Sequence, residues 1–337
     1  MPFRTIVGHS RLLSLLARVI ARDSMPPALL LAGPPGVGKR LTAVAIAEAI
    51  NCLQPQSTSA FERDACGECA SCRRIGRGMH PDVIVVAPGE LGTIKIEQLR
   101  DVIDRSQYRP FEGRRRVVII DEADAATPDA QSALLKTLEE PPSASVFILV
   151  SSMPDALLPT VLSRCPRLRF SPLTPSEVVK ALVQNHGHAE QEARIAAAES
   201  DGSIGRALES QSEELFEARD AAQRVLEETA RNNDPVKRIN LARELSDGKG
   251  SPAEERNKLA VRLRSLGSLL RDVGIIATHA DRAMIANTDL EQPLEKLASS
   301  YDAQRSMQAY TAVDRALAAL DRNASPKVVA DWLLLEL

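Results

Sequence analysis

Residues 115–165 read RRVVIIDEADAATPDAQSALLKTLEEPPSASVFILVSSMPDALLPTVLSRC, and this stretch decides the fold. It contains two short apolar runs, Val117 to Ile120 and Val146 to Val150, that have the length of buried strands. Between them, Thr127 and the proline after it open a helix, because Thr caps helix N-termini and proline suits the first helical turn. Buried strands that alternate with helices predict an α/β domain with a parallel sheet.

The composition of the whole chain narrows the class of protein. Its 337 residues suffice for two or three domains, and 42 Lys and Arg nearly balance 45 Asp and Glu, for a net charge of −3. A dedicated nucleic-acid binder normally carries a strong basic excess, so this balance argues against that class. The N-terminus lacks a secretory signal pattern, and the apolar runs fall short of the roughly 18 residues that span a bilayer. We therefore expect a cytoplasmic protein with no membrane partner.

Strand-like runs are confined to the first half of the chain. Residues 1–170 alternate such runs with helical patterns, which predicts a parallel sheet with flanking helices. The four expected strands are Ala28 to Ala32, Val83 to Ala87, Val117 to Ile120 and Val146 to Val150.

From residue 171 onward the sequence indicates helices. The segment Thr174-Pro175-Ser176-Glu177 has the pattern of a capping box, and we expect residues 171–212 to form a small helical domain. Residues 213–337 show no strand signal, and Leu, Val and Ala recur in them at helical spacing, so an all-helical third domain is predicted. Its clearest helical stretches are 259–270, 309–320 and 328–335.

A glycine-rich turn follows the first expected strand. It reads Gly33-Pro34-Pro35-Gly36-Val37-Gly38-Lys39 and opens a helix, which is the sequence and the context of a P-loop. Gly33, Gly36 and Gly38 let backbone N–H groups converge on phosphate oxygens, and Lys39 reaches the outer phosphates. The motif predicts a site for ATP or ADP; the alternative is a turn rich in Gly and Pro that binds no ligand.

The next residue, Arg40, departs from the P-loop motif. Ser or Thr is required there, because its hydroxyl ligates Mg²⁺. A cation about 4 Å from the metal would cost several kcal/mol even at an effective dielectric of about 20. Thr42 is no substitute, since two residues further on it lies about 200° around the helix. We expect weak nucleotide and Mg²⁺ binding at most, and inefficient hydrolysis.

The acidic pair Asp121-Glu122 follows the strand that ends at Ile120. In an active P-loop site the Asp would hold Mg²⁺ through water, and the Glu would activate the attacking water. Given Arg40, the pair either keeps these roles, is vestigial, or only ends the strand.

Four cysteines, Cys52, Cys66, Cys69 and Cys72, are separated by 13, 2 and 2 residues. The C-x2-C-x2-C run suits a metal knuckle, and four thiolates make a closed tetrahedral zinc site without an open position for catalysis. A cytoplasmic location disfavours disulfides. The spacing alone leaves two alternatives, a zinc site and ordinary reduced thiols.

The segment SALLKTLEEPP at 132–142 and the triplet Ser163-Arg164-Cys165 together resemble clamp-loader AAA+ subunits. The resemblance implies that residues 1–170 form an AAA+ domain with a four-Cys zinc module at 52–72, that 171–212 form a lid, and that 213–337 form an oligomerising collar. It also implies that Arg164 projects into the nucleotide site of a neighbouring subunit. Such an arginine finger can contribute about 10³–10⁵ in rate.

Two further site positions follow from the resemblance alone. Ser151 or Ser152 falls where the family places its polar sensor 1 residue. The segment from Gly202 to Leu208 resembles the sensor 2 segment, but ATPase members have Arg where Gly205 stands. Arg206 is one step, about 100°, around the helix, so we expect it to miss the phosphate.

Within this family the residues favour the δ′ class over the γ/τ class. Members of the γ/τ class keep an intact P-loop, whereas δ′ subunits keep the SRC arginine while their own site is often degraded, as Arg40 and Arg206 suggest here. The resemblance implies a stator in a hetero-pentamer with γ/τ and δ subunits, which loads the sliding clamp on primed DNA for DNA polymerase III. The alternative is a catalytically active, γ/τ-like ATPase subunit; a P-loop kinase or helicase and a pure DNA-binding module are disfavoured.

Overall fold

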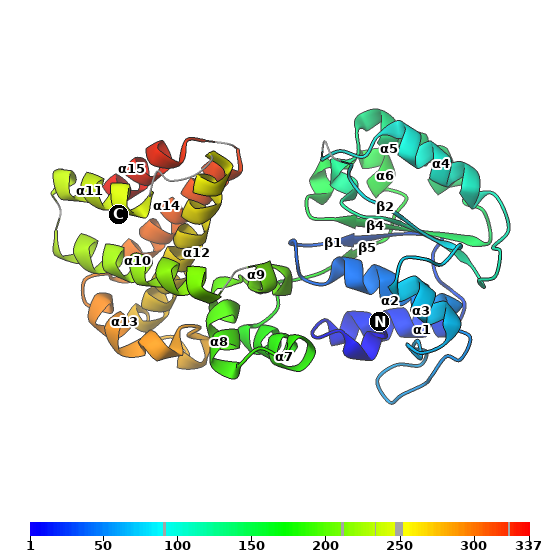
Figure 1. Cartoon of the computed structure of the whole chain (residues 1–337), viewed down its shortest axis with the longest axis horizontal. Coiled ribbons are helices and arrows are strands. Elements are labelled where there is room, and N and C mark those ends of the chain that lie inside the picture. Colours follow the sequence, from blue (N-terminus) through cyan, green and yellow to red (C-terminus); the bar gives the residue numbers. More distant parts are fainter. Residues whose placement is uncertain (90–91, 210–211, 233, 247–251, 323) are drawn as a thin grey trace. The chain divides into compact units, whose positions relative to one another are not determined.

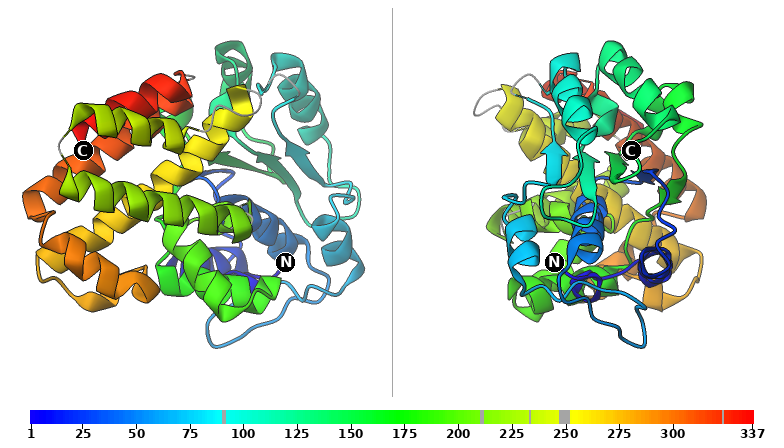
Figure 2. Two further views of the ribbon diagram at one scale, coloured as in Figure 1. Left: turned by 60° about the vertical axis from the view of Figure 1, so that its left-hand side comes forward. Right: turned by 90° about the vertical axis from the view of Figure 1, so that its right-hand side faces the viewer.

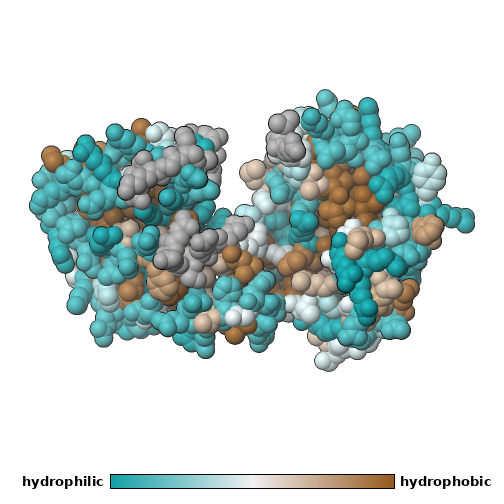
Figure 3. All heavy atoms as spheres, in the orientation of Figure 1, coloured by the Kyte–Doolittle hydropathy of each residue, from teal (hydrophilic) through white to brown (hydrophobic). Residues whose placement is uncertain are grey.

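The computed structural model of the chain is shown in Figure 1. On the face drawn in Figure 3 most of the surface is hydrophilic, with smaller groups of hydrophobic residues. Among the described helices, none combines the length and the apolar character that crossing a membrane would demand. The structure describes the whole chain except residues 90–91, 210–211, 233, 247–251 and 323.

Two compact units make up the chain, each with its own hydrophobic core. Unit 1 consists of residues 1–177 together with 203–205, and unit 2 consists of residues 178–202 together with 206–337. Most of the segment expected to form a lid therefore shares a unit with the helices expected to form a collar. The three-part division at residues 170 and 212 stays a prediction about function.

Unit 1 is built on a five-stranded sheet of β1 (Ala28–Ala32), β2 (Val83–Val86), β3 (Arg116–Ile120), β4 (Ser145–Ser151) and β5 (Arg167–Arg169). The strand order is β2-β3-β4-β1-β5, and all neighbouring strands are parallel, which confirms the predicted parallel sheet. The four expected strands are present. The strand β5 is additional: it pairs with β1 at the sheet edge, and its Arg-Leu-Arg sequence offers only one apolar residue.

Helices cover both faces of this sheet and lie above and below the strands in Figure 1. Because successive strand residues point to opposite faces, Ile119 and Ile148 join one core cluster while Ile120 and Leu149 join the other. Every residue of β1, β3 and β4 is buried, as expected for strands covered on both sides. The helices of unit 1 are α1 (Ser10–Ala21), α2 (Lys39–Asn51) and α3 (Ala70–Gly76) on one face and α4 (Ile96–Ser106), α5 (Pro128–Glu139) and α6 (Pro159–Leu162) on the other, with 3-10 turns at Phe3–Thr5, Ala123–Ala125 and Pro154–Ala156.

The predicted helix starts are explained by local hydrogen bonds. Thr127 caps α5, because its side chain accepts the N–H of Ala130, and proline follows at the first helical position. The capping box is formed as well: the N–H of Thr174 donates to Glu177 at 2.9 Å, and the N–H of Glu177 donates to Thr174 Oγ1 at 3.3 Å. Side-chain acceptors at these positions satisfy N–H groups that have no partner inside the helix.

The described residues of unit 2 form helices and turns without strands. Its longest helix is in contact with five other helices of this unit, and the left view of Figure 2 shows several helices of this part of the chain packed together. Buried Leu, Val and Ala side chains make the core, as the helical spacing predicted. The helices are α7 (Pro175–His186), which starts in unit 1, α8 (Glu190–Glu199), α9 (Ile204–Glu209), α10 (Ser212–Arg231), α11 (Pro235–Leu245), α12 (Pro252–Ala277), α13 (Glu291–Ala298), α14 (Ala303–Asp321) and α15 (Pro326–Glu336), with 3-10 turns at Arg282–Met284 and Thr288–Leu290.

A buried carboxylate, Asp82, ties the loop between α4 and β3 to the start of β2. It accepts the N–H groups of Phe111, Glu112 and Gly113 at 2.7, 2.9 and 2.8 Å, and the guanidinium of Arg116 at 3.1 Å. Burial alone would raise the pKa of Asp82, but these donors outweigh it and hold the pKa below its usual value. The charge is therefore fully compensated in the interior.

Candidate nucleotide site and metal centre

The P-loop connects β1 to α2, the context that the motif requires. Gly36 and Gly38 have φ values of 72° and 97°, in the left-handed region that favours glycine. A Cβ atom at Gly36 would lie 2.1 Å from the Ser203 Oγ, and the Gly36 carbonyl accepts the N–H of Gly205 at 3.1 Å. The segment 203–205 therefore holds the loop at Gly36. An added Cβ at Gly38 would meet no described atom within 4 Å, so the loop is open there.

Lys39 is buried inside the loop, with 5% of its surface exposed. Its ammonium group donates to the carbonyls of Gly33 and Pro34 at 2.6 and 2.5 Å, and to Ser152 Oγ at 3.1 Å. Burial lowers the pKa of Lys39, against the attraction of Asp124 and Asp121. The ammonium thus lies inside the loop, bonded to loop oxygens that it would exchange for those of a phosphate.

Arg40 forms an ion pair with Asp121, the acid at the end of β3. The distance from Arg40 Nη1 to Asp121 Oδ2 is 3.3 Å, and Asp121 is 7% exposed. The Thr42 hydroxyl is fully buried and donates to the Gly38 carbonyl at 3.0 Å, so it is not available as a ligand. Mg²⁺ prefers oxygen ligands in octahedral geometry. The residues present therefore do not fit a Mg²⁺ ion held in the ordinary P-loop manner.

The remaining acids and serines lie around the ends of β3 and β4. Glu122 has φ 49° and ψ 49°, a left-handed conformation that is uncommon for a residue other than glycine. Ser152 contacts Lys39, whereas Ser151 continues the strand face of Phe147 and Leu149, and its buried hydroxyl has no hydrogen-bond partner among the described residues. The Ser152 side chain, and not that of Ser151, therefore contacts Lys39, whereas Ser151 contacts the P-loop through its carbonyl, which accepts the N–H of Gly33 at 3.2 Å.

Asp124 belongs to this site but was not among the residues that the sequence indicated. Its Oδ1 accepts the N–H of Ser152 at 3.0 Å, and its charge attracts Lys39. The only signal in the sequence was a further acid, two residues after Glu122. That signal is weak, because acidic residues are common after such strands.

In the segment that resembles sensor 2, Gly205 packs against the P-loop, whereas Arg206 forms an ion pair in unit 2. A Cβ at Gly205 would lie 2.9 Å from the Gly36 Cα, so a larger residue there would require the loop to shift. Arg206 Nη1 donates to Asp201 at 3.1 Å within unit 2. Gly205 therefore contributes close packing to the P-loop, and Arg206 contributes an ion pair to its own unit.

Arg164 lies on the loop between α6 and β5. Its guanidinium donates to the Thr160 carbonyl at 2.9 Å and to the Ser163 hydroxyl at 3.2 Å, and it forms an ion pair with Glu139 at the end of α5. The side chain is 32% exposed. Cys165 next to it is buried, and burial raises the pKa of this thiol to about 11. In this triplet Arg164 is partly exposed to solvent, and the buried Cys165 fixes the loop to the core.

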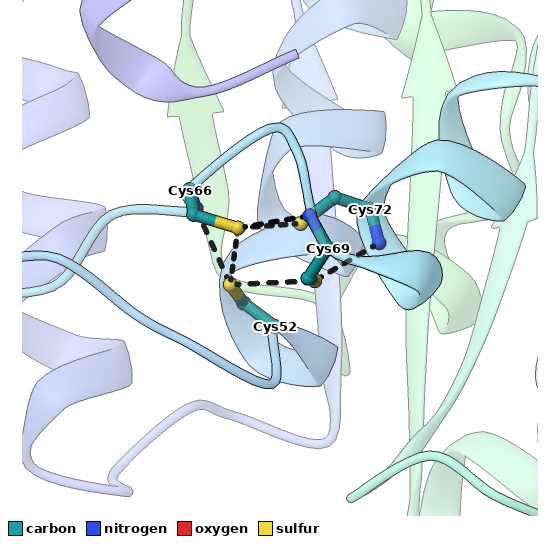
Figure 4. Close-up of side chains that lie close together, drawn as sticks. All are labelled: Cys52, Cys66, Cys69 and Cys72. Atoms are coloured by element: carbon teal, nitrogen blue, oxygen red, sulfur yellow. Dashed lines mark hydrogen bonds between the residues drawn. The ribbon is translucent and has the colours of Figure 1, made fainter.

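The four predicted cysteines converge, as Figure 4 shows, and their sulfurs all lie within 4.8 Å of one another. Sγ–Sγ distances are 3.6 Å for Cys52–Cys66, 4.0 Å for Cys52–Cys69 and 4.0 Å for Cys66–Cys72. A tetrahedral Zn²⁺ with Zn–S bonds of about 2.3 Å requires sulfur separations of about 3.8 Å. The donor set and its spacing therefore fit zinc.

The electrostatics of the cluster also fit a cation. Burial raises the pKa of the Cys52 and Cys72 thiols. Burial acts in the same direction on Cys69, but N–H groups of Cys72 and Leu53 donate to its sulfur and lower its pKa to about 6. A bound metal deprotonates its thiol ligands, and its positive charge would compensate the buried thiolates.

The cysteine cluster is anchored by Arg4 and Asp64, which the sequence did not single out. Arg4 donates to the carbonyls of Ala65 and Cys66 at 2.8 and 2.9 Å, and to Asp64 Oδ2 at 3.1 Å. Asp64 is fully buried and also accepts the N–H of Phe3 at 2.7 Å. The N-terminal segment and the cysteine cluster therefore support each other.

Comparisons of the sequence with known proteins indicate a family. The model of the family described as DNA polymerase III, delta subunit, matches residues 8–174. Subunit delta′ of DNA polymerase III from Pseudomonas aeruginosa is 40% identical over 139 residues, which are 41% of this chain and 41% of that protein. Subunit tau from Escherichia coli is 33% identical over 211 residues, which are 61% of this chain and 32% of that protein.

The family match lies within the α/β part of the chain. The chain spans a third to two fifths of the length of these two curated relatives. A solved structure of a DNA polymerase III, gamma subunit-related protein from Thermotoga maritima aligns with 95% of this chain and 96% of its own, at 18% identity and a TM-score of 0.43. The family match, the delta′ and tau relatives and the parallel-sheet fold lead to one conclusion: residues 8–174 belong to the family of AAA+ clamp-loader subunits of DNA polymerase III.

Proposed function

We propose that this chain is a δ′-type clamp-loader subunit that does not hydrolyse ATP in its own site. The ion pair between Arg40 and Asp121, at 3.3 Å, carries this proposal. It places a cation and its counter-charge where an ATPase subunit needs a Mg²⁺ ion and a hydroxyl ligand. Gly205 and the ion pair of Arg206 with Asp201 add support, since Gly205 carries no charge at the position where ATPase members have Arg, and Arg206 is paired with an acid of unit 2.

Arg164 would act in trans, on ATP bound by a neighbouring γ/τ subunit. Its guanidinium is partly exposed and is held only by groups of its own surface region. On contact with the γ-phosphate of the neighbour, it would stabilise the negative charge that builds up there in the transition state. Asp121 and Glu122 would then be vestigial in this chain.

The cysteine cluster would hold a structural Zn²⁺ ion. Four thiolates satisfy the metal completely, which leaves no position for substrate. The ion would fix the turn that carries Cys66 and Cys69 against α3, and Arg4 would connect this turn to the N-terminal segment.

The partners of the chain would be γ/τ and δ subunits in a hetero-pentamer in the cytoplasm. Unit 2 would supply both the lid and the collar, and the assembled ring would load the sliding clamp on primed DNA. With a net charge of −3, direct DNA binding by the chain alone would be weak.

Reconstitution tests this assignment against the alternative of a γ/τ-like ATPase. The chain would be mixed with γ/τ and δ subunits, and the ATPase rate would be measured for the complex and for the chain alone. We expect no turnover by the chain alone, and a complex whose ATPase rate falls when this subunit is omitted. Magnesium-dependent turnover by the isolated chain would instead support the γ/τ-like alternative.

A further inference from the structure

The P-loop of this chain contains its own cation. We propose that Arg40 takes the place of the Mg²⁺ ion, so that the loop binds a metal-free di- or triphosphate anion and gains no affinity from magnesium. This inference rests on the proposed non-hydrolytic state of the site and names the ligand that such a site would take.

The geometry puts the guanidinium at the position of the metal. In a P-loop ATPase, Mg²⁺ lies between the hydroxyl of the residue after the Lys and the acid at the end of the neighbouring strand. Here the side chain at that position is Arg40, and its Nη1 lies 3.3 Å from Asp121 Oδ2. A single side chain thus replaces both the hydroxyl and the ion.

The guanidinium keeps donors for a ligand. An arginine has five N–H donors, and Asp121 is the one ion-pair partner of Arg40 found among the described residues. The Arg40 side chain is 63% exposed, so the rest of the guanidinium faces solvent. Arginine binds phosphate through two parallel N–H···O bonds, a geometry that needs no bridging metal.

Contacts within the chain hold the loop in its shape. His9 Nε2 lies 3.1 Å from the Val37 carbonyl, Gly33 packs against Phe170, and Gly36 packs against Gly205. Lys39 is already inside the loop, and Gly38 faces open space among the described residues. The N–H groups at the start of α2 can therefore receive an anion once the Lys39 ammonium exchanges the loop carbonyls for phosphate oxygens.

Magnesium has no comparable place. The positive charge of Arg40 would repel the ion, and Asp121 is already paired with this arginine. The Thr42 hydroxyl is not available as a ligand, because it donates to the Gly38 carbonyl. In solution Mg²⁺ instead binds the phosphates and reduces their charge, which weakens their attraction to Lys39 and Arg40. Magnesium should thus leave the affinity unchanged or lower it.

Calorimetric titration of the full chain with ATP, in EDTA and in excess Mg²⁺, tests the proposal. The wild type should bind ATP in EDTA, and excess Mg²⁺ should leave the Kd unchanged or increase it. Arg40→Thr restores the hydroxyl and removes the cation: its affinity in EDTA should fall at least about tenfold, and magnesium should restore it by a similar factor. Inorganic tripolyphosphate should show the same pattern, because the phosphates carry the recognition.

Lys39→Ala serves as the control that places the ligand in the loop, since it should abolish binding under both conditions. A wild type whose affinity magnesium raises by about threefold or more, or one that does not bind ATP in EDTA at millimolar concentration, would overturn the proposal. Circular dichroism melts check folding, and exposed Arg40 should be replaceable without loss of stability. The proposed stator role is judged separately, because the ATPase rate of the assembled complex depends on Arg164.

Discussion

Among single residues, Arg40 and Arg164 carry the proposal that this chain is not an ATPase subunit. Arg40 is paired with Asp121 inside the chain, and Arg164 is paired with Glu139 on the surface. In the proposed function the first pair would occupy the metal position of the chain's own site, whereas Arg164 would meet a phosphate of a neighbouring subunit. The chain would then have lost its own ATPase chemistry and kept the residue that serves a neighbour.

Glu139 should restrain Arg164, because their ion pair has to break before the guanidinium can reach another subunit. Exposed pairs contribute about 0.2–1 kcal/mol, so Glu139→Gln should raise the ATPase rate of the reconstituted complex by at most about fivefold. Glu140→Gln, an identical change on the next residue, should leave the rate unaltered. A loss of rate in Glu139→Gln alone would mean that Glu139 positions Arg164 for catalysis.

Asp82 gives a prediction that depends on pH. Its pKa is lowered in the folded state, so its stabilising effect is present above the unfolded pKa of about 3.9 and is lost as the pH falls through the folded value. Asp82→Asn should lower the free energy of unfolding at pH 7 by about 3 kcal/mol, since breaking a buried charge pair costs about that much.

Urea unfolding between pH 3 and pH 7 measures this effect. The difference between wild type and Asp82→Asn should shrink at the acidic end. Asp101→Asn, at an exposed carboxylate 3.6 Å from Arg105, should change stability by less than about 0.5 kcal/mol. Equal losses in the two variants would contradict the anchoring role of Asp82.

At the scale of elements, strands could be predicted from the sequence only where they are buried and therefore apolar. The strands β1, β3 and β4 are buried throughout and stood out as apolar runs, but β5 has two arginines around one leucine and gave no such signal. The cysteine spacing identified the cluster, because metal ligands are few and specific. Its anchor, Arg4 with Asp64, joins residues 60 positions apart, and only the fold brings them together.

Removal of the metal should loosen two elements at once. Because Arg4 connects the cysteine turn to the N-terminal segment, chelation should speed amide hydrogen exchange in residues 64–76 and in residues 1–6. The fully buried strand β4 should keep its protection. Mass spectrometry of the exchanged peptides measures both regions. Unchanged exchange in residues 1–6 would mean that the metal does not stabilise the N-terminal segment.

The same experiment has a matched cysteine control. Cys69→Ser should lower zinc content below one ion per chain and reproduce the fast exchange, since it removes one of four ligands. Cys165→Ser changes a buried cysteine outside the cluster and should leave the zinc content at one. Equal zinc content in the two variants would rule out the four-cysteine site.

At the scale of the whole molecule, the chain consists of two units for which different tasks are proposed. Unit 1 carries the P-loop, Arg164 and the cysteine cluster, and unit 2 carries the helices proposed to assemble the ring. The sequence indicated the change from sheet to helices near residue 171. The sharing of one unit by the expected lid and collar was not visible, because helical periodicity does not tell which helices pack together.

The central claim is that this subunit acts on the ATP of a neighbour and not on its own. The most direct test is the steady-state ATPase rate of the reconstituted clamp loader that contains the wild-type chain, Arg164→Ala or Lys39→Ala. We expect a loss of at least about tenfold for Arg164→Ala, a conservative share of the effect of an arginine finger, and little change for Lys39→Ala. A large loss for Lys39→Ala with little change for Arg164→Ala would contradict the account and identify the chain as an ATPase subunit.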